Sequence, residues 1–226
     1  MLYFPQHKVA FLHGQRTGGT SILRWAEINY PYLTQRIQLI DWHSPLKNKI
    51  EAGFSMEGNT VFTSIRNPYE AIYGMYQLFR HMKPDAGHIA MAKSCEFKEF
   101  AKWFCQINSQ LTDVNMLVAY PRFIGIDGEI PTNLLIMHIE TLQEDFNTVA
   151  RLMGLDSFNT QLPHVNKITD KEVNGGPLQE KITEYHYSPD VYDYETAGYV
   201  MSVFEWAFES GHYDIDWRII KPLRGV

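Results

Sequence analysis

The sequence has few cysteines, no long apolar run and no signal-peptide pattern. Its two cysteines, Cys95 and Cys105, are expected on one helix, ten positions apart, where they point in different directions or lie too far apart to pair. They form no zinc-ligand pattern either, so neither a disulfide framework nor a metal site is expected. No apolar run approaches the roughly 18 residues of a membrane span. We therefore expect a soluble, cytoplasmic protein.

The chain also lacks a strong net charge. The formal charge is −6 over 226 residues, which gives no overall field to attract nucleic acid or a membrane surface. Any anionic ligand must therefore be held by local basic residues. A hydrophobic content of 45% and a charged content of 20% are typical of a globular protein. Because no repeat or linker is present, we expect a single domain over residues 1–226.

Short apolar runs alternate with helical patterns along the chain. The predicted strands cover residues 8–13, 59–66 and 132–140, and a weaker candidate ends near residue 43. The predicted helices cover residues 20–30, 67–80, 95–107, 142–153 and 190–210. Residues 81–94 are predicted as a loop, and Thr141 with Glu144 as a capping box. The alternation indicates an α/β fold with a parallel sheet.

Polar loops follow the predicted strands, at residues 14–21, 43–47 and 66–74. In parallel α/β sheets, ligands bind at the carboxyl ends of the strands. These three loops are therefore the expected binding region.

The first loop, "HGQRTGGTS", matches a phosphate-binding loop except at its cation. Gly14 and Gly19 have the spacing of G-x-x-x-x-G-K-[ST], but Thr20 replaces the lysine and Arg16 stands four residues earlier. Backbone N–H groups and the dipole at a helix start attract an anion, and Arg16 adds a charge. We predict an anion site here, and the alternative is a tight turn without a ligand.

A second candidate cation, Arg66, ends the predicted strand 59–66. It lies beside the first loop if the two strands are neighbours, where it could hold a second phosphate. The alternative is a surface arginine paired with a carboxylate. A magnesium-dependent nucleotide hydrolase is disfavoured, because the loop lysine is absent and Glu140 is the best available acidic residue after a strand.

Several segments resemble one enzyme family. "QRTGGTS" and "SIRNPYEAIYGMY" are similar to the two cofactor-binding segments of sulfotransferases that use 3′-phosphoadenosine 5′-phosphosulfate (PAPS), in particular the carbohydrate branch. "DWHSPLKNKI", "LLIMHIETLQEDF", "LPHVNK" and "YETAGYVMSVFEWAFESGHY" resemble further segments in the same order, over roughly residues 8–213. The resemblance implies a three-layer P-loop-like α/β fold with a central parallel sheet flanked by helices. It also implies a mainly helical acceptor-side segment at about residues 80–130.

The resemblance implies PAPS as sulfuryl donor, with no metal required. It assigns the 5′-phosphosulfate end to residues of the first loop and the 3′-phosphate to Arg66. The implied cofactor-binding residues are Gln15, Arg16, Thr17, Gly18, Gly19, Thr20, Ser21, Arg66 and Gly74. Three positions depart from the family: Arg16 replaces a lysine, Gly74 a serine and Ala71 an arginine. These departures predict weaker cofactor binding unless Ser64 or Lys167 compensates.

A catalytic base is expected among the histidines, because the acceptor hydroxyl must lose a proton near neutral pH. His43 is the first candidate, since it follows a candidate strand and the resemblance places a histidine there; its alternative role is to cap local backbone. His13, beside the first loop, is the rival. Arg16 and the loop amides would stabilise the leaving phosphate. The lesser candidates are His138 and His164, with Asp41 as a residue that could orient His43.

The expected acceptor is a hydroxyl of a glycan or small molecule, and neither nucleic acid nor a membrane is expected as a partner. The sequence does not indicate an oligomeric state. Two alternative functions remain open: a P-loop small-molecule kinase, and a non-catalytic nucleotide-binding relative.

Overall fold

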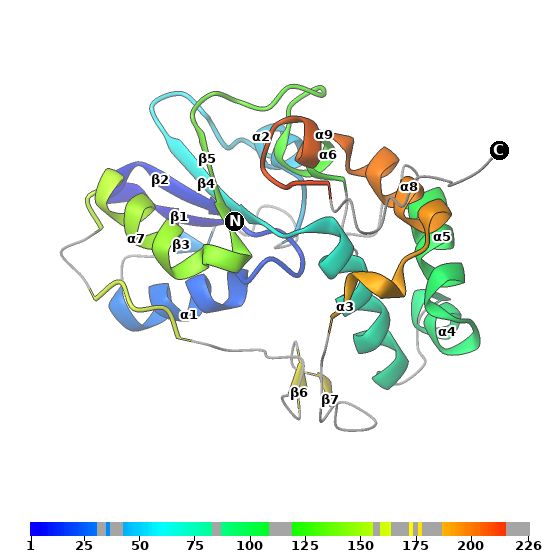
Figure 1. Ribbon diagram of the computed structural model, residues 1–226. Coiled ribbons are helices and arrows are strands. Elements are labelled where there is room, and N and C mark those ends of the chain that lie inside the picture. The colour runs from blue at the N-terminus through cyan, green and yellow to red at the C-terminus, as the bar shows by residue number, and fades with distance from the viewer. Residues whose placement is uncertain are drawn as a thin grey trace. The chain divides into compact units, whose positions relative to one another are not determined.

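The computed structural model describes residues 1–30, 35–36, 43–82, 87–108, 119–155, 159–163, 172–173, 176–177 and 187–215. The residues expected to form one domain divide by their contacts into two compact units. The first comprises Met1–Arg66 and Thr112–Val165, and the second comprises Asn67–Leu111 and Asn166–Val226. The first unit holds the main sheet, and the second is mainly helical (Figure 1).

The first unit is built on a mixed sheet with the strand order β3-β1-β2-β4-β5 (Figure 1). Its strands are β1 (Leu2–Phe4), β2 (Val9–Leu12), β3 (Gln35–Arg36), β4 (Thr60–Ile65) and β5 (Leu134–His138). β2, β4 and β5 are parallel, with Leu12 beside Thr63 and Thr63 beside Ile136. The α/β class and the three predicted strands are confirmed. The sheet is not parallel throughout, because β1, which the sequence did not predict, runs antiparallel to β2 and β3.

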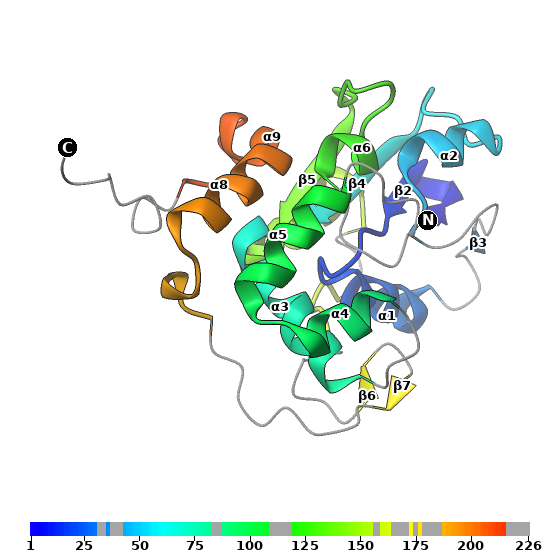
Figure 2. The same ribbon diagram turned by 90° about the vertical axis from the view of Figure 1, so that its right-hand side faces the viewer.

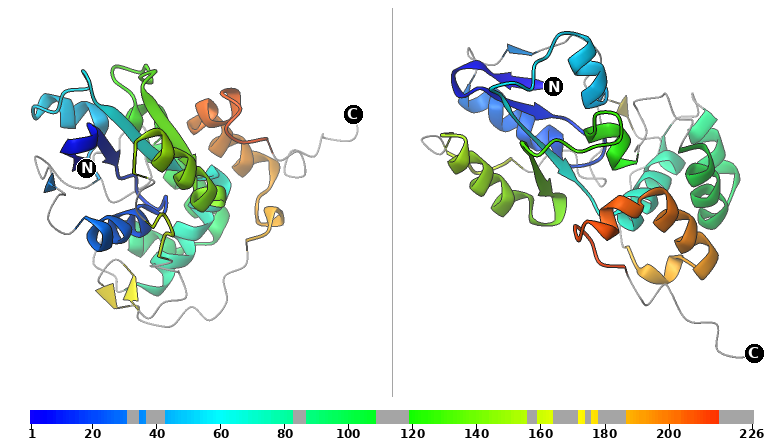
Figure 3. Two further views of the ribbon diagram at one scale, coloured as in Figure 1. Left: turned by 90° about the vertical axis from the view of Figure 1, so that its left-hand side faces the viewer. Right: turned by 90° about the horizontal axis from the view of Figure 1, so that it is seen from above.

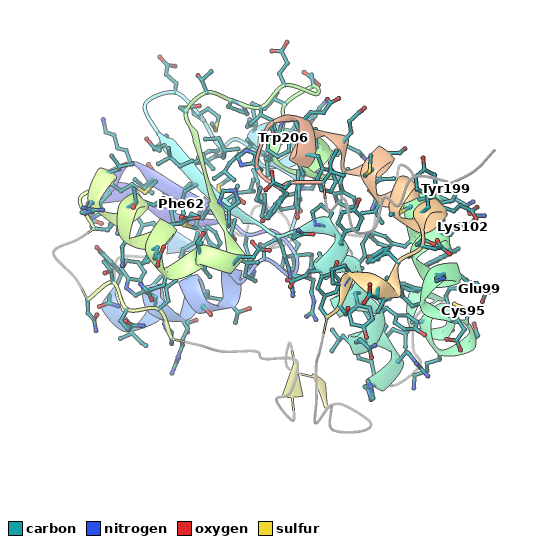
Figure 4. The ribbon with its side chains drawn as sticks, in the orientation of Figure 1. Phe62, Cys95, Glu99, Lys102, Tyr199 and Trp206 are labelled. Carbon is teal, nitrogen blue, oxygen red and sulfur yellow. The ribbon has the colours of Figure 1, made fainter. Side chains whose placement is uncertain are left out.

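Helices flank this sheet. They are α1 (Gly19–Asn29), α2 (Leu46–Glu51), α6 (Tyr120–Ile124) and α7 (Leu142–Leu152), with the short 3₁₀ turns η1 (Pro5–His7) and η2 (Ile139–Thr141). α1 and α7 share one core with the sheet, where Trp25 meets Phe146 edge to face at 4.8 Å. Phe62 on β4 is buried in the same core (Figure 4). Figures 2 and 3 show α2 across the sheet from α1.

The second unit contains five α-helices in its described part. They are α3 (Pro68–His81), α4 (Gly87–Ser94), α5 (Phe97–Asn108), α8 (Tyr194–Val203) and α9 (Glu205–Glu209), with η3 (Pro189–Val191) and the short strands β6 (Glu172–Val173) and β7 (Gly176–Pro177). Asn67 caps α3, and its side-chain oxygen accepts the backbone N–H of Tyr69 at 3.0 Å. α5 and α8 pack together, and Lys102 lies over the ring of Tyr199 at 5.2 Å (Figure 4). Within the described ranges, no helix is long and apolar enough to cross a bilayer.

Three predictions of local structure were wrong. The expected loop 81–94 contains α4, a helix with a weak apolar pattern that buries Ile89 and Ala92. The expected helix 190–210 is interrupted at Phe204, which separates α8 from α9. Cys95 precedes α5 and does not share a helix with Cys105; both thiols are free, and burial raises the pKa of Cys105 to about 12. Of the weaker candidate strand, the structure has β3, and residues 37–42 lie outside the described residues.

The predicted capping box at the start of α7 is also absent. Thr141 makes no side-chain capping bond; its hydroxyl donates to Oδ2 of Asp145 at 3.1 Å. The same oxygen accepts the backbone N–H of His138 at 2.7 Å and lies 3.1 Å from Nδ1 of its ring. One carboxylate therefore ties the end of β5 to the first turn of α7.

This contact predicts which acidic residue stabilises the α7 junction. We expect Asp145→Ala to lower the free energy of unfolding by about 2 kcal/mol, because three donors lose a charged acceptor. Glu144→Ala is the matched control: Glu144 is exposed, and its removal should change stability by less than about 0.5 kcal/mol. Urea unfolding of both variants makes the comparison. A larger loss for Glu144→Ala would support the capping box that the sequence predicted.

Candidate functional site

The loop between β2 and α1 contains two residues with positive φ, a feature that it shares with anion-binding nests. Arg16 has a φ of 61° and Gly18 a φ of 77°, while Thr17 between them is not among the positive-φ residues. Such alternation turns successive backbone N–H groups toward one concavity, and the start of α1 follows directly. A left-handed conformation costs a residue with a side chain about 1–2 kcal/mol. The loop therefore holds its predicted cation in a strained conformation, as binding sites often do.

Packing and hydrogen bonds hold this loop in place within the first unit. The hydroxyl of Thr17 donates to the carbonyl of Gly14 at 3.1 Å and accepts from the hydroxyl of Ser64 at 3.1 Å. A Cβ atom at Gly18 would lie 2.8 Å from the Leu142 side chain. The end of β4 therefore supports the loop from one direction and the start of α7 from another. Ser64 is a candidate compensating phosphate ligand, but its hydroxyl donates its hydrogen bond to Thr17.

The ring of His13 packs against the backbone at the start of α1. Its ring stacks on Phe11, with 5.7 Å between centroids, and a Cβ atom at Gly19 would lie only 1.9 Å from it. Only 9% of His13 is exposed. Burial, and then the nearby His43, lowers the pKa of His13 to about 3, so the imidazole is neutral at ordinary pH. The predicted place beside the loop is confirmed, but so low a pKa makes His13 a weak base.

His43 lies against His13, immediately before the turn that leads into α2. The two ring centroids are 4.5 Å apart, and Nδ1 of His43 is 3.4 Å from the backbone carbonyl of His13. A carbonyl only accepts, so Nδ1 must carry the proton in this contact, which leaves the lone pair of a neutral ring on Nε2. His43 is half-buried, a setting in which a base can still meet a substrate. The contact also keeps open the alternative role of binding local backbone.

Arg66 follows β4 directly. β2 and β4 are neighbouring parallel strands, so the loop after β2 and Arg66 after β4 start from the same edge of the sheet. The backbone N–H of Arg66 donates to the hydroxyl of Tyr120 at 3.0 Å, and that hydroxyl donates to the carbonyl of Arg66. Sequence reasoning missed Tyr120, because the pattern around residues 108–130 is weak. The available signal was the dipeptide Tyr120-Pro121, which places proline in the first turn of a short helix.

The other predicted residues fall into four groups. Gln15 and Thr20 are half-buried, and Ser21 is buried, in the loop and the first turn of α1. Gly74 is buried in α3, which belongs to the second unit. The ring of His138 is bound to Asp145. The candidates outside the described residues are Asp41, His164 and Lys167.

No metal centre accompanies these residues in the described part of the chain. No group of three His, Cys, Asp or Glu side chains is arranged there to hold a metal ion. The loop and the end of β4 instead carry Arg16 and Arg66, whose guanidinium groups suit an anion.

No protein-family model matches the chain, and a search of curated proteins finds no match. The function must therefore be inferred from the residues of the site and from their geometry.

The buried His13 predicts how stability depends on pH. The folded-state pKa of about 3 lies below the ordinary value of 6.5, so the unfolded chain takes up a proton that the folded protein refuses. The contribution of His13 to the free energy of unfolding is fully present above about pH 6.5. Between that pH and about pH 3 it falls by about 1.4 kcal/mol per pH unit, so about 2 kcal/mol is lost at pH 5. His13→Phe keeps an aromatic ring beside Phe11 and should lose this part of the pH dependence. Urea unfolding at pH 7.5 and pH 5 tests it; equal pH dependence in parent and variant would contradict the assignment.

Proposed function

We propose that the protein is a PAPS-dependent sulfotransferase with a P-loop-like arrangement, acting on a hydroxyl of a glycan or small molecule. The observation that carries the proposal is the nest-like loop opening α1 beside β4, the strand that leads directly to Arg66. A donor with two separate phosphate positions needs two such anion sites on neighbouring strands. The ordered resemblance of the flanking segments adds support.

The two anion sites would have different tasks. The loop amides and Arg16 would hold the 5′-phosphosulfate end of the donor. Arg66 would hold the 3′-phosphate, the group that distinguishes this donor from ATP. A guanidinium can bind a phosphate through two parallel hydrogen bonds, and it remains charged at any relevant pH. Arg16 can therefore stabilise charge, but it cannot supply a proton.

The proposed chemistry is a direct transfer of the sulfuryl group. The acceptor oxygen forms a bond to sulfur while the bond between sulfur and the bridging phosphate oxygen breaks. The acceptor proton passes to Nε2 of His43, the nitrogen left with a lone pair by the Nδ1 contact to His13. The charge that develops on the departing 5′-phosphate is stabilised by the loop amides and Arg16.

The two alternative functions would use the same loop differently. A small-molecule kinase would need ATP and magnesium, and the position of the loop lysine is occupied by Thr20. A non-catalytic relative would bind the nucleotide without transfer, which the losses at Ala71 and Gly74 make a real alternative. Nucleotide selectivity tests the first alternative, and transfer tests the second.

We expect the parent protein to bind adenosine 3′,5′-bisphosphate more tightly than adenosine 5′-monophosphate. Arg66→Ala should reduce this preference about 10- to 100-fold, because a charge-assisted contact to the 3′-phosphate is lost. Arg151→Ala, at an exposed position of α7, is the matched control and should preserve the preference. Calorimetric titration of each variant with both nucleotides gives the ratio. If the protein binds ATP in the presence of magnesium but binds neither the bisphosphate nor the monophosphate, the kinase is favoured.

The second expectation concerns transfer. His43→Ala should lower sulfuryl transfer to a panel of glycans and phenols by about 10²- to 10⁴-fold, the usual contribution of a general base, while nucleotide affinity is retained. His7→Ala, in η1, is the matched control and should retain full activity. An active His43→Ala variant would remove His43 as the base. Nucleotide binding by the parent with no transfer to any acceptor would identify the non-catalytic relative.

A further inference from the structure

The short helix α6 contacts both predicted anion sites of the first unit. At its start, the hydroxyl of Tyr120 binds the backbone of Arg66. One turn later, the ring of Phe123 lies 3.4 Å from the place where a Cβ atom at Gly14 would stand. A single rigid turn of helix therefore spans from the 3′-phosphate candidate to the base of the loop. The same helix packs against α2, which follows His43.

The Tyr120 hydroxyl binds the backbone of the first residue after the end of β4. The pairing of β4 with β5 ends at Ile65 and His138, so Arg66 lies just beyond the ladder. There Tyr120 accepts the N–H and donates to the C=O of the same residue, as a neighbouring strand would. Tyr120 is 3% exposed, and burial raises its pKa, so the hydroxyl keeps the proton that it donates. The backbone of Arg66 is thus fixed, although its side chain is only half-buried.

We propose that Tyr120 is a positioning residue that sets the distance between the Arg66 guanidinium and the loop, and so selects ligands with two separately placed phosphates. This inference rests on the proposed function. A long arginine side chain has many rotamers, so its reach is defined only if its Cα is fixed. α6 fixes that Cα relative to Gly14. Loss of the hydroxyl would therefore weaken the second phosphate contact and leave the first unchanged.

The test compares two Tyr→Phe variants. Each removes one buried or half-buried hydroxyl, and the two hydroxyls lie at the two ends of β4. Tyr120→Phe releases Arg66, after the strand. Tyr3→Phe releases Asn59, before the strand, whose side-chain oxygen accepts from Tyr3 at 2.9 Å. The affinities of parent and variants are measured for adenosine 3′,5′-bisphosphate and adenosine 5′-monophosphate. Tyr120→Phe should lose about five- to tenfold of the bisphosphate affinity, with monophosphate affinity unchanged, and Tyr3→Phe should match the parent.

The outcomes separate this inference from the proposed function. If the parent prefers the bisphosphate and Tyr120→Phe keeps that preference, the inference is wrong and the proposed function stands. Equal losses in both Tyr→Phe variants would show a general effect on the sheet and would also overturn it. A parent without any preference for the bisphosphate would overturn the proposed function and, with it, the selectivity assigned to Tyr120. Hydrogen exchange gives a second readout, since the Arg66 amide should exchange faster in Tyr120→Phe than in Tyr3→Phe.

Discussion

The parallel pairing of β2 with β4 is the constraint on which the candidate site depends. It places Leu12 beside Thr63, so both strands end at the same edge of the sheet. His13 and the loop continue from one strand, and Arg66 continues from the other. A shift of the pairing by one residue would turn the side chains of β4 to opposite faces and remove Ser64 from Thr17. The buried Phe11–Phe62 contact, 5.0 Å between centroids, holds that register.

The site combines a strained loop with a tightly packed surrounding. Arg16 adopts a left-handed conformation that a side chain disfavours, and Gly18 and Gly19 lie where any Cβ atom would collide with Leu142 or His13. Such a loop persists because neighbouring elements hold it: Ser64 from β4, Leu142 from α7 and Phe123 from α6. This packing would serve the proposed function. Backbone N–H groups bind an anion well only when they already point at it, so that binding requires no reorganisation.

The sequence predicted the elements that carry this edge, because each has a strong local signal. These signals are the β-branched residues before Arg66, the Asn67-Pro68 cap and the double glycine at the start of α1, and each depends only on neighbouring residues in the sequence. What it missed depends on distant contacts. α4 has too weak an apolar periodicity to reveal a helix that buries Ile89. The bonding of Asp145 to His138 requires the strand to end where it does. Tyr120 is 54 positions from Arg66, and no local pattern announces that contact.

The departures from the family pattern at Ala71 and Gly74 can be considered together with the position of Arg66. Arg66 ends the N-terminal segment of the first unit, and α3, which contains both positions, begins two residues later in the second unit. Under the proposed function, loss of the 3′-phosphate contacts that the resemblance implies along α3 would leave that phosphate to Arg66, whose backbone β4 and α6 hold. A guanidinium on a fixed backbone is a strong enough ligand for this role. Under the proposed function, Gly74 on α3 and the buried Tyr120 on α6 would be related, because binding of the 3′-phosphate would depend less on several ligands and more on the placement of Arg66.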